Sequence, residues 1–159
     1  MEIKIIPCEE KYIEKVLQLV VMAWTPIYEG YKEILGEEMF NDIYYDWKEK
    51  KCERIYKAMT SPRGFVALSD GEVAGFIHYD IDYDKKLGII EENAVNPLFR
   101  GQGIAQKMYD FVYDKMKSES MKYVNVSTML DDAHQSARRA YEKSGFTKAL
   151  ESINYYKEL

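Results

Sequence analysis

The segment from Val95 to Ala105 has the composition of a phosphate-binding turn. An apolar, strand-like run ends at Asn96-Pro97, and a helical pattern of apolar residues begins at Ile104. Backbone N–H groups at the start of a helix point outward and carry partial positive charge, which suits a phosphate. Gly101 and Gly103 would let the backbone approach a ligand closely, because neither has a Cβ atom. Two such glycines are equally compatible with a tight connection that only requires positive φ, so the turn alone leaves both interpretations open.

Two common nucleotide-binding motifs do not fit this turn. The Gly-Lys-Ser/Thr sequence that ends a nucleotide P-loop is missing from it. It also lacks the complete Gly-x-Gly-x-x-Gly pattern that follows the first strand of a dinucleotide-binding fold. Both of these classes of nucleotide site are therefore disfavoured.

The length of 159 residues suits one domain, residues 1–159. The hydrophobic pattern around the turn predicts a mixed α/β (α+β) class. The pattern predicts strands at 3–6, 65–68, 73–83, 87–95 and 123–130, with a final hairpin at 146–159. It predicts helices at 9–24, within 28–59, at 104–116 and from 132 to the glycine at 145. We expect Pro26 to end the first helix, and Asp70-Gly71 to form a hairpin turn. Asp132 and Gln135 have the spacing of a capping box.

The composition excludes several classes of protein. The chain is 47% hydrophobic and 31% charged, which supports a packed core and argues against disorder. A net charge of −5 and the lack of a basic stripe disfavour nucleic acid as a partner. Cys8 and Cys52 lack the spacing of a disulfide framework or a zinc site, so no metal is expected. The apolar run 19–24 is too short to cross a bilayer, and no signal peptide is evident, so we expect a cytoplasmic protein.

Two segments together resemble the GNAT superfamily of N-acetyltransferases. The stretch Val-x-Pro-x-x-Arg-Gly-x-Gly-Ile-Ala resembles the acetyl-CoA motif of that family, Gln/Arg-x-x-Gly-x-Gly/Ala, through Arg100, Gly103 and Ala105. Downstream, the stretch from Ala137 to Phe146, which includes Tyr141-Glu142-Lys143, resembles the second motif of the family. The resemblance covers residue 65 to the C-terminus. The first sixty residues share only the strand-then-helices layout.

The resemblance implies a fold and a cofactor site. The fold would be a mixed, mostly antiparallel sheet of six to seven strands with helices on both faces. Strand 87–95 would splay from strand 123–130, and acetyl-CoA would bind in the wedge between them. The backbone near Ala94 and Val95 would pair with the pantetheine arm. The pyrophosphate would be held by the backbone amides of Arg100, Gly101, Gln102, Gly103, Ile104 and Ala105.

The implied reaction is transfer of the acetyl group to a primary amine by direct attack in a ternary complex. By resemblance, Tyr141 would give a proton to the leaving thiolate, since a phenol is neutral at pH 7. The base that deprotonates the amine would be Glu92 or Glu91, directly or through water, and we favour Glu92. Because strand side chains alternate, only one of the two should face the cleft unless a bulge intervenes. The competing interpretations are a core tyrosine and surface carboxylates.

One position departs from the family pattern. His134 stands where the family usually has asparagine, and it projects from nearly the same side of the helix as Tyr141. Imidazole could contact the cofactor arm and make its binding depend on pH, whereas the competing interpretation is a solvated first-turn residue. Arg138, Arg139 and Lys143 are charged residues that could reach the 3′-phosphate.

The acceptor would be a small-molecule or peptide amine. The expected acceptor site lies among the early helices, the turn after Tyr83 and the last hairpin. Aromatic and acidic residues gather in these regions: Trp24, Tyr28, Tyr31, Tyr44, Tyr45, Trp47, Tyr155, Tyr156, Glu29, Glu33, Asp42 and Asp46. Such a pocket would suit a cationic amine. An exposed terminal hairpin could also support a homodimer. The alternative function is a non-catalytic acyl-CoA-binding sensor module, which would keep the phosphate turn but need no acid or base.

Overall fold

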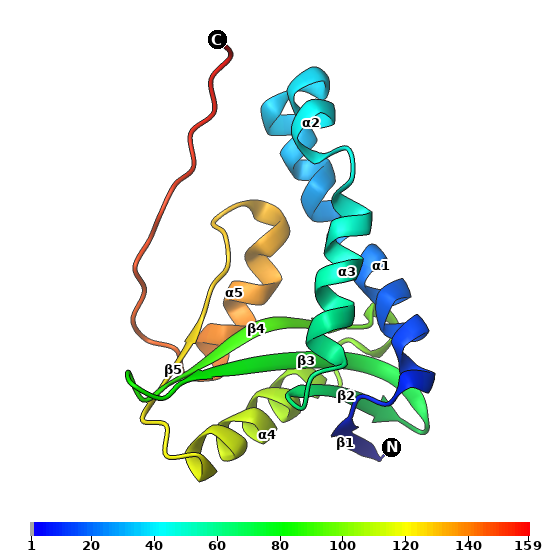
Figure 1. Ribbon diagram of the computed structural model, residues 1–159, viewed down its shortest axis with the longest axis vertical. Coiled ribbons are helices and arrows are strands. Elements are labelled where there is room, and N and C mark those ends of the chain that lie inside the picture. Colours follow the sequence, from blue (N-terminus) through cyan, green and yellow to red (C-terminus); the bar gives the residue numbers. More distant parts are fainter. Residues whose placement is uncertain (1) are drawn as a thin grey trace.

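A single sheet with strand order β1-β2-β3-β4-β5 forms the centre of the computed structural model, which describes residues 2–159 (Figure 1). The strands are β1 (Ile3–Pro7), β2 (Gly64–Ser69), β3 (Glu72–Asp82), β4 (Leu87–Val95) and β5 (Tyr123–Val126). Neighbouring strands are antiparallel except β4 and β5, which are parallel. The mixed, mostly antiparallel sheet that the sequence predicts is confirmed, but the described residues form five strands instead of six to seven.

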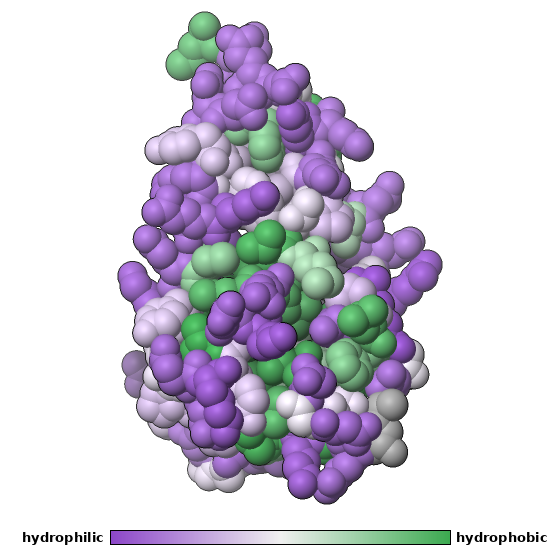
Figure 2. Space-filling model, turned by 90° about the vertical axis from the view of Figure 1, so that its right-hand side faces the viewer, coloured by the Kyte–Doolittle hydropathy of each residue, from purple (hydrophilic) through white to green (hydrophobic). Residues whose placement is uncertain are grey.

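Helices cover both faces of this sheet. They are α1 (Glu10–Leu35), α2 (Glu37–Tyr44), α3 (Trp47–Met59), α4 (Ile104–Ser118) and α5 (Gln135–Lys143), with short 3-10 turns at Pro97–Phe99 and Asp132–His134. Buried residues of α1 and α3 pack with Val66 and Phe76 on one face. Buried residues of α4, together with Tyr141 of α5, pack with Ala67 and Ile77 on the other. On the side that carries α1, apolar groups gather centrally and hydrophilic side chains surround them (Figure 2).

The β2–β3 hairpin forms as its turn sequence predicts. Ser69 pairs with Glu72, which leaves Asp70 and Gly71 as a two-residue loop. Both loop residues have positive φ, 49° and 89°. Two consecutive positive φ values define the type I′ turn that suits the twist of a hairpin, and Asp-Gly is a preferred sequence for it.

The first helix does not end at Pro26 as the sequence suggests. Helix α1 runs through Pro26 to Leu35. Proline removes a single N–H donor from the helix, and packing beyond it outweighs that loss. Tyr28, just past Pro26, stacks on Trp47 of α3 with ring centroids 4.1 Å apart. The carbonyl that loses the Pro26 donor is that of Met22, and the Thr25 hydroxyl donates to the neighbouring carbonyl of Val21 at 2.6 Å.

The prediction of a C-terminal hairpin is wrong. Residues 144–159 contain no strand and extend away from the sheet toward α2 (Figure 1). Apolar alternation predicts which face of a strand would be buried, but a strand also needs a partner, and this segment is left exposed. The strand that begins at Tyr123 likewise ends at Val126 instead of residue 130, where its pairing with β4 stops.

The start of α5 also differs from the prediction. The sequence places a capping box at Asp132 and Gln135, but helix α5 begins at Gln135 after a 3-10 turn over Asp132–His134. The Asp131 side chain contacts the ring of His134 at this point.

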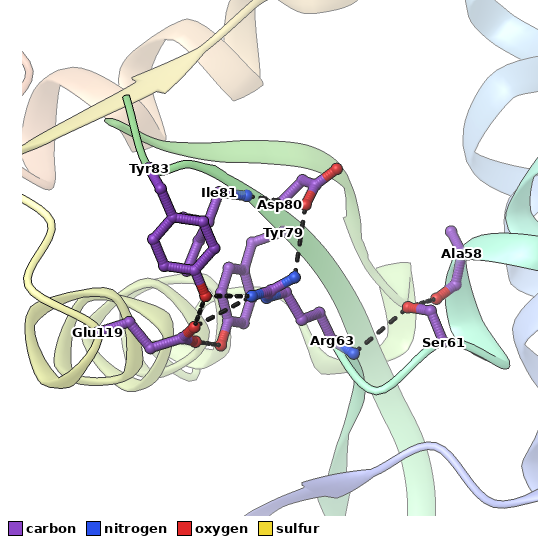
Figure 3. Close-up of polar contacts among 8 residues, drawn as sticks. All are labelled: Ala58, Ser61, Arg63, Tyr79, Asp80, Ile81, Tyr83 and Glu119. Carbon is purple, nitrogen blue, oxygen red and sulfur yellow. Dashed lines mark hydrogen bonds and ion pairs between the residues drawn. The ribbon is translucent and has the colours of Figure 1, made fainter. Parts of the chain in front are cut away.

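A network of ion pairs and hydrogen bonds fixes the C-terminal end of α4 to the sheet (Figure 3). Glu119 receives hydrogen bonds from Arg63 at 3.0 Å and from Tyr83 at 2.7 Å. The bond from Tyr83 and the guanidinium of Arg63 lower the pKa of the Glu119 carboxyl. Arg63 lies before β2 and Tyr83 follows β3, so the network joins three elements. It therefore holds the helix whose opposite end carries the phosphate turn.

The Gly64→Ala variant should be strongly destabilised. A Cβ atom at Gly64 would lie 2.6 Å from Met59 Cα and 2.7 Å from the Met59 carbonyl oxygen. These are backbone atoms that cannot rotate away, so we expect a loss of about 3 kcal/mol in the free energy of unfolding. Urea unfolding measures the effect. The matched control is Gly30→Ala in α1, where a Cβ meets nothing within 4 Å and helix propensity adds up to about 1 kcal/mol. Equal stability of the two variants would contradict the close contact between α3 and β2.

Candidate active site

The phosphate turn has the geometry that the sequence predicts. Gly101 and Gly103 have φ values of 78° and 74°, a conformation that side chains with a Cβ rarely adopt. Gly103 is the N-cap of α4, and no side chain in the described range caps the helix there. The N–H groups of the first helical turn therefore lack intrahelical acceptors and are directed out of the helix end. The side-chain oxygen of Gln102 is buried and has no hydrogen-bond partner within residues 2–159.

Strand β4 opens a wedge beside this turn. Its ladder with β5 joins Leu87–Ile90 to Tyr123–Val126 and goes no further. On the other side, the pairing with β3 shifts so that Tyr79 faces Ile90 and His78 faces Glu92, which makes Glu91 the extra residue of a bulge. The backbone of Ala94 and Val95 stays paired with β3 and borders the wedge. Main-chain groups on the open side of β4 can therefore pair with an extended ligand that carries amides.

Tyr141 lies beside Asn93 of β4 and is held by two side chains that are not among the residues predicted from the sequence. The side-chain amide nitrogen of Asn93 donates to the Tyr141 hydroxyl at 3.1 Å, and the Tyr109 hydroxyl donates to Oδ1 of Asn93 at 3.1 Å. Tyr141 is 9% exposed. Burial raises its pKa, and the hydrogen bonds from Asn93 and Tyr109 partly oppose that rise. Strand alternation could have predicted a role for Asn93, because it puts residue 93 on the face of the strand opposite to residue 92.

Asn93→Ala should reduce both stability and turnover. The change leaves the buried hydroxyl of Tyr109 without its acceptor and releases Tyr141 from its donor. We expect a loss of about 2 kcal/mol in unfolding free energy, since an unsatisfied buried polar group costs about 1–3 kcal/mol. We also expect kcat to fall about tenfold through misplacement of Tyr141. Denaturant unfolding and steady-state kinetics measure the two effects. Asn125→Ala on β5, an exposed position, is the stability control and should match the wild type.

Glu92 lies on the opposite face of β4 from Asn93. Its side chain is buried, and both carboxylate oxygens have cationic partners from α3. Lys51 Nζ lies 2.9 Å from Oε2, and Arg54 Nε lies 2.8 Å from Oε1. Glu91, in the bulge, is more exposed and lies 3.6 Å from the guanidinium of Arg54. Lys51 and Arg54 are not among the residues predicted from the sequence, although their i, i+3 spacing puts them on one helix face.

His134 and Arg138 both contact residues of the loop between β5 and α5. His134 lies on the turn before α5, and its Nδ1 atom contacts the carboxylate of Asp131. Arg138 donates to the carbonyl oxygens of Met129 and Asp131 at 2.6 and 2.8 Å. These contacts order the loop between β5 and α5. In this arrangement the guanidinium of Arg138 is bonded to that loop.

The expected acceptor region forms an aromatic cluster where α1, α2 and α3 meet. Tyr28 stacks on Trp47 and lies edge-on to Tyr31 and Tyr44, with centroids 5.2 and 5.7 Å away. A cavity of about 160 Å³ lies against it, lined by Thr25, Tyr28, Glu29, Lys32, Phe40, Trp47 and Lys48. The Tyr156 hydroxyl meets the Tyr44 hydroxyl at 2.8 Å, which brings the C-terminal segment to the same place. Of the predicted acidic residues, Glu29 lines this cavity and Asp46 lines a neighbouring one.

Residues 2–159 hold no cluster of three or more His, Cys, Asp or Glu side chains arranged for a metal ion. Among the helices described, none is both long and apolar enough to cross a bilayer.

Comparison with known proteins places this architecture in a family. The model of the acetyltransferase (GNAT) family matches residues 24–146, so the chain belongs to that family. N-alpha-acetyltransferase 30 of Schizosaccharomyces pombe is 24% identical over 157 residues, which cover 97% of this chain and 90% of the relative. The family membership confirms the predicted superfamily and enzyme class: the protein is an acetyl-CoA-dependent N-acetyltransferase.

Solved structures share the fold. The aminoglycoside acetyltransferase AAC(6')-Iy, in complex with a CoA bisubstrate analogue, has a TM-score of 0.67 and 18% identity, and the match covers all of both chains. The PaiA N-acetyltransferase of Thermoplasma acidophilum, in complex with coenzyme A, has a TM-score of 0.69 and 19% identity, with 92% of this chain and 91% of that chain covered. At these identities the likeness establishes the fold of this chain.

Proposed function

We propose that this acetyltransferase moves the acetyl group of acetyl-CoA to a primary amine by direct attack in a ternary complex. The observation that carries the proposal is the arrangement at β4. The strand leaves β5 after Ile90, Tyr141 is hydrogen-bonded to it through Asn93, and the glycine turn follows its end. An extended ligand with a phosphate at one end and a thioester at the other fits the order of these features along β4.

Backbone groups would hold acetyl-CoA. The amides from Arg100 to Ala105 bind the pyrophosphate at the start of α4, where Arg100 adds charge. Main-chain groups near Ala94 and Val95 pair with the pantetheine arm, and an N–H there stabilises the oxyanion. His134, on the turn before α5, would contact the arm. When bound, acetyl-CoA supplies the activated acetyl group, and no metal is needed.

Side chains on the two faces of β4 would move the protons. Tyr141 donates its phenolic proton to the leaving thiolate, and burial favours the neutral, proton-bearing form. Glu92 accepts the proton of the incoming ammonium, and the more exposed Glu91 in the bulge can do so through water. Tyr141 and Glu92 lie on opposite faces of β4, so the proton donor and the proton acceptor can act from opposite sides of the strand.

The acceptor would be a small-molecule or peptide amine that enters past the aromatic cluster. The rings of Tyr28 and Trp47 and the carboxylate of Glu29 favour a cation. AAC(6')-Iy acts on an aminoglycoside, and the yeast relative is an N-alpha-acetyltransferase. Aminoglycosides and peptide N-termini both present primary amines, which supports this class of acceptor without choosing between them.

The assembly and the compartment are proposed on separate grounds. Leu150, Ile153 and Tyr155 of the C-terminal segment are exposed, which favours a homodimer that covers them. Cys8 and Cys52 are free thiols, which favours the reducing cytoplasm. Light scattering at several protein concentrations tests the dimer.

A calorimetric titration with acetyl-CoA, followed by turnover measurements on a panel of amines, tests the function. We expect binding and release of free CoA thiol with at least one cationic primary amine. Binding without turnover across amino acids, polyamines, aminoglycosides and peptides would favour the sensor module instead. Absence of binding by the folded protein would contradict the proposed function.

A further inference from the structure

A lysine side chain already occupies the place where the proposed base would meet an amine. Lys51 Nζ lies 2.9 Å from Oε2 of Glu92, and both side chains are largely buried, with 13% and 5% of their surfaces exposed. Glu92 is the neighbour of Asn93, whose amide contacts the Tyr141 hydroxyl. The ion pair and the proposed acid therefore meet β4 at adjacent residues, on opposite faces of the strand.

The distance between Lys51 and Glu92 meets the requirement for general-base catalysis. A base must lie within hydrogen-bond reach of the proton that it removes. In the described part of the chain, the cationic side chains on Glu92 are those of Lys51 and Arg54. Arg54 keeps its proton and is a poor nucleophile. Lys51 is a primary amine, the same chemical group as the acceptor.

The surroundings of Lys51 favour reactivity further. Burial lowers its pKa, although the Glu92 carboxylate opposes the change. A lysine with a lowered pKa carries a larger fraction of the neutral, nucleophilic amine at a given pH. The Trp24 ring, 4.3 Å from Nζ, attracts the ammonium and so holds it beside Glu92 before the proton is removed. The exposed Lys50 on the same helix pairs instead with Asp46, away from β4.

We propose that Lys51 is an internal acetyl acceptor, modified by the protein's own acetyl-CoA when no external amine is present. The proposal rests on the proposed function. Glu92 takes one proton from the Lys51 ammonium, and the nitrogen bonds to the acetyl carbon as the carbon–sulfur bond breaks. The thiolate takes the phenolic proton of Tyr141, and the second proton that leaves the nitrogen restores the Tyr141 phenol. One hydrogen stays on the amide nitrogen, and the proton on Glu92 passes to solvent. Nothing is oxidised or reduced.

Intact-mass and peptide mass spectrometry of the full-length protein test the proposal. The purified protein is incubated with acetyl-CoA alone, and we expect one acetyl group to accumulate on Lys51. The Lys51→Arg variant keeps a cation on Glu92 but should lose this modification, whereas Lys50→Arg should retain it. The Tyr141→Phe variant should acetylate Lys51 at least tenfold more slowly, and a saturating external amine should slow the wild-type reaction.

The outcomes separate this proposal from the proposed function. If CoA thiol is released with external amines but Lys51 stays unmodified after prolonged incubation, the internal-acceptor proposal is wrong and the proposed function still holds. Equal acetylation of Lys51 and of exposed lysines, unchanged in Tyr141→Phe, indicates uncatalysed chemistry and also overturns it. Failure of the protein to bind acetyl-CoA by calorimetry overturns both. Selective modification of Lys51 that depends on Tyr141 supports the internal acceptor.

Discussion

Replacing Gly103 with glutamate will weaken acetyl-CoA binding by at least about 100-fold, which corresponds to about 3 kcal/mol. Gly103 caps α4 with φ at 74°, and its neighbours present the amides proposed to hold the pyrophosphate. A side chain here strains the turn, and a carboxylate adds negative charge where the ligand is anionic. Loss of two charge-assisted hydrogen bonds at about 1.5 kcal/mol each accounts for the expected effect. Isothermal titration calorimetry measures it.

A control variant separates charge from backbone strain. Asparagine tolerates positive φ better than other residues with a side chain, and it carries no charge. Gly103→Asn should therefore retain binding within about tenfold of the wild type. Thermal unfolding of each variant shows whether the fold is intact. Wild-type affinity in a folded Gly103→Glu protein would place the phosphate site elsewhere.

The parts of the fold that could be predicted from the sequence are those with local causes. The β2–β3 turn follows from Asp70-Gly71, and β4 has the predicted bounds because an apolar run meets Asn96-Pro97. The C-terminal hairpin was predicted wrongly because alternation says nothing about the availability of a neighbouring strand. The prediction that Pro26 ends the first helix is wrong because packing of Tyr28 on Trp47 stabilises α1 beyond it. Local preference decides an element only where tertiary contacts do not oppose it.

The same distinction between local and long-range causes applies to the residues of the proposed site. The glycine turn and Tyr141 could be singled out because their motifs are short segments of the chain. The partners of these residues come from distant segments: Lys51 is 41 positions from Glu92, and Asn93 is 48 positions from Tyr141. Spacing along one element cannot reveal such pairs. In the structure the Glu92 carboxylate, the proposed base, is already paired with Lys51 and Arg54. The amine within its reach is therefore that of Lys51.

The Tyr141→Phe variant will lower kcat by about 100-fold or more, because a positioned general acid contributes about 10²–10⁴-fold. The ring remains to fill its site, so affinity for acetyl-CoA should stay within about threefold of wild type. Loss of the hydrogen bond from Asn93 should reduce unfolding free energy by about 1 kcal/mol. Thiol release under saturating substrates and calorimetry measure these quantities. Tyr113→Phe is the matched control, because its hydroxyl contacts Ser144 at 2.8 Å.

The pH dependence gives the prediction a second test. Burial raises the pKa of Tyr141 above the ordinary tyrosine value of about 10. The folded protein therefore keeps the phenolic proton at any pH below that value, and kcat should not fall from its loss between pH 6 and 9, a range of about three units. A wild-type profile that declines on the basic side within this range, and is unchanged in Tyr141→Phe, would assign the acid to another group. Retention of kcat by the variant would do the same, because the thiolate would then leave without the Tyr141 proton.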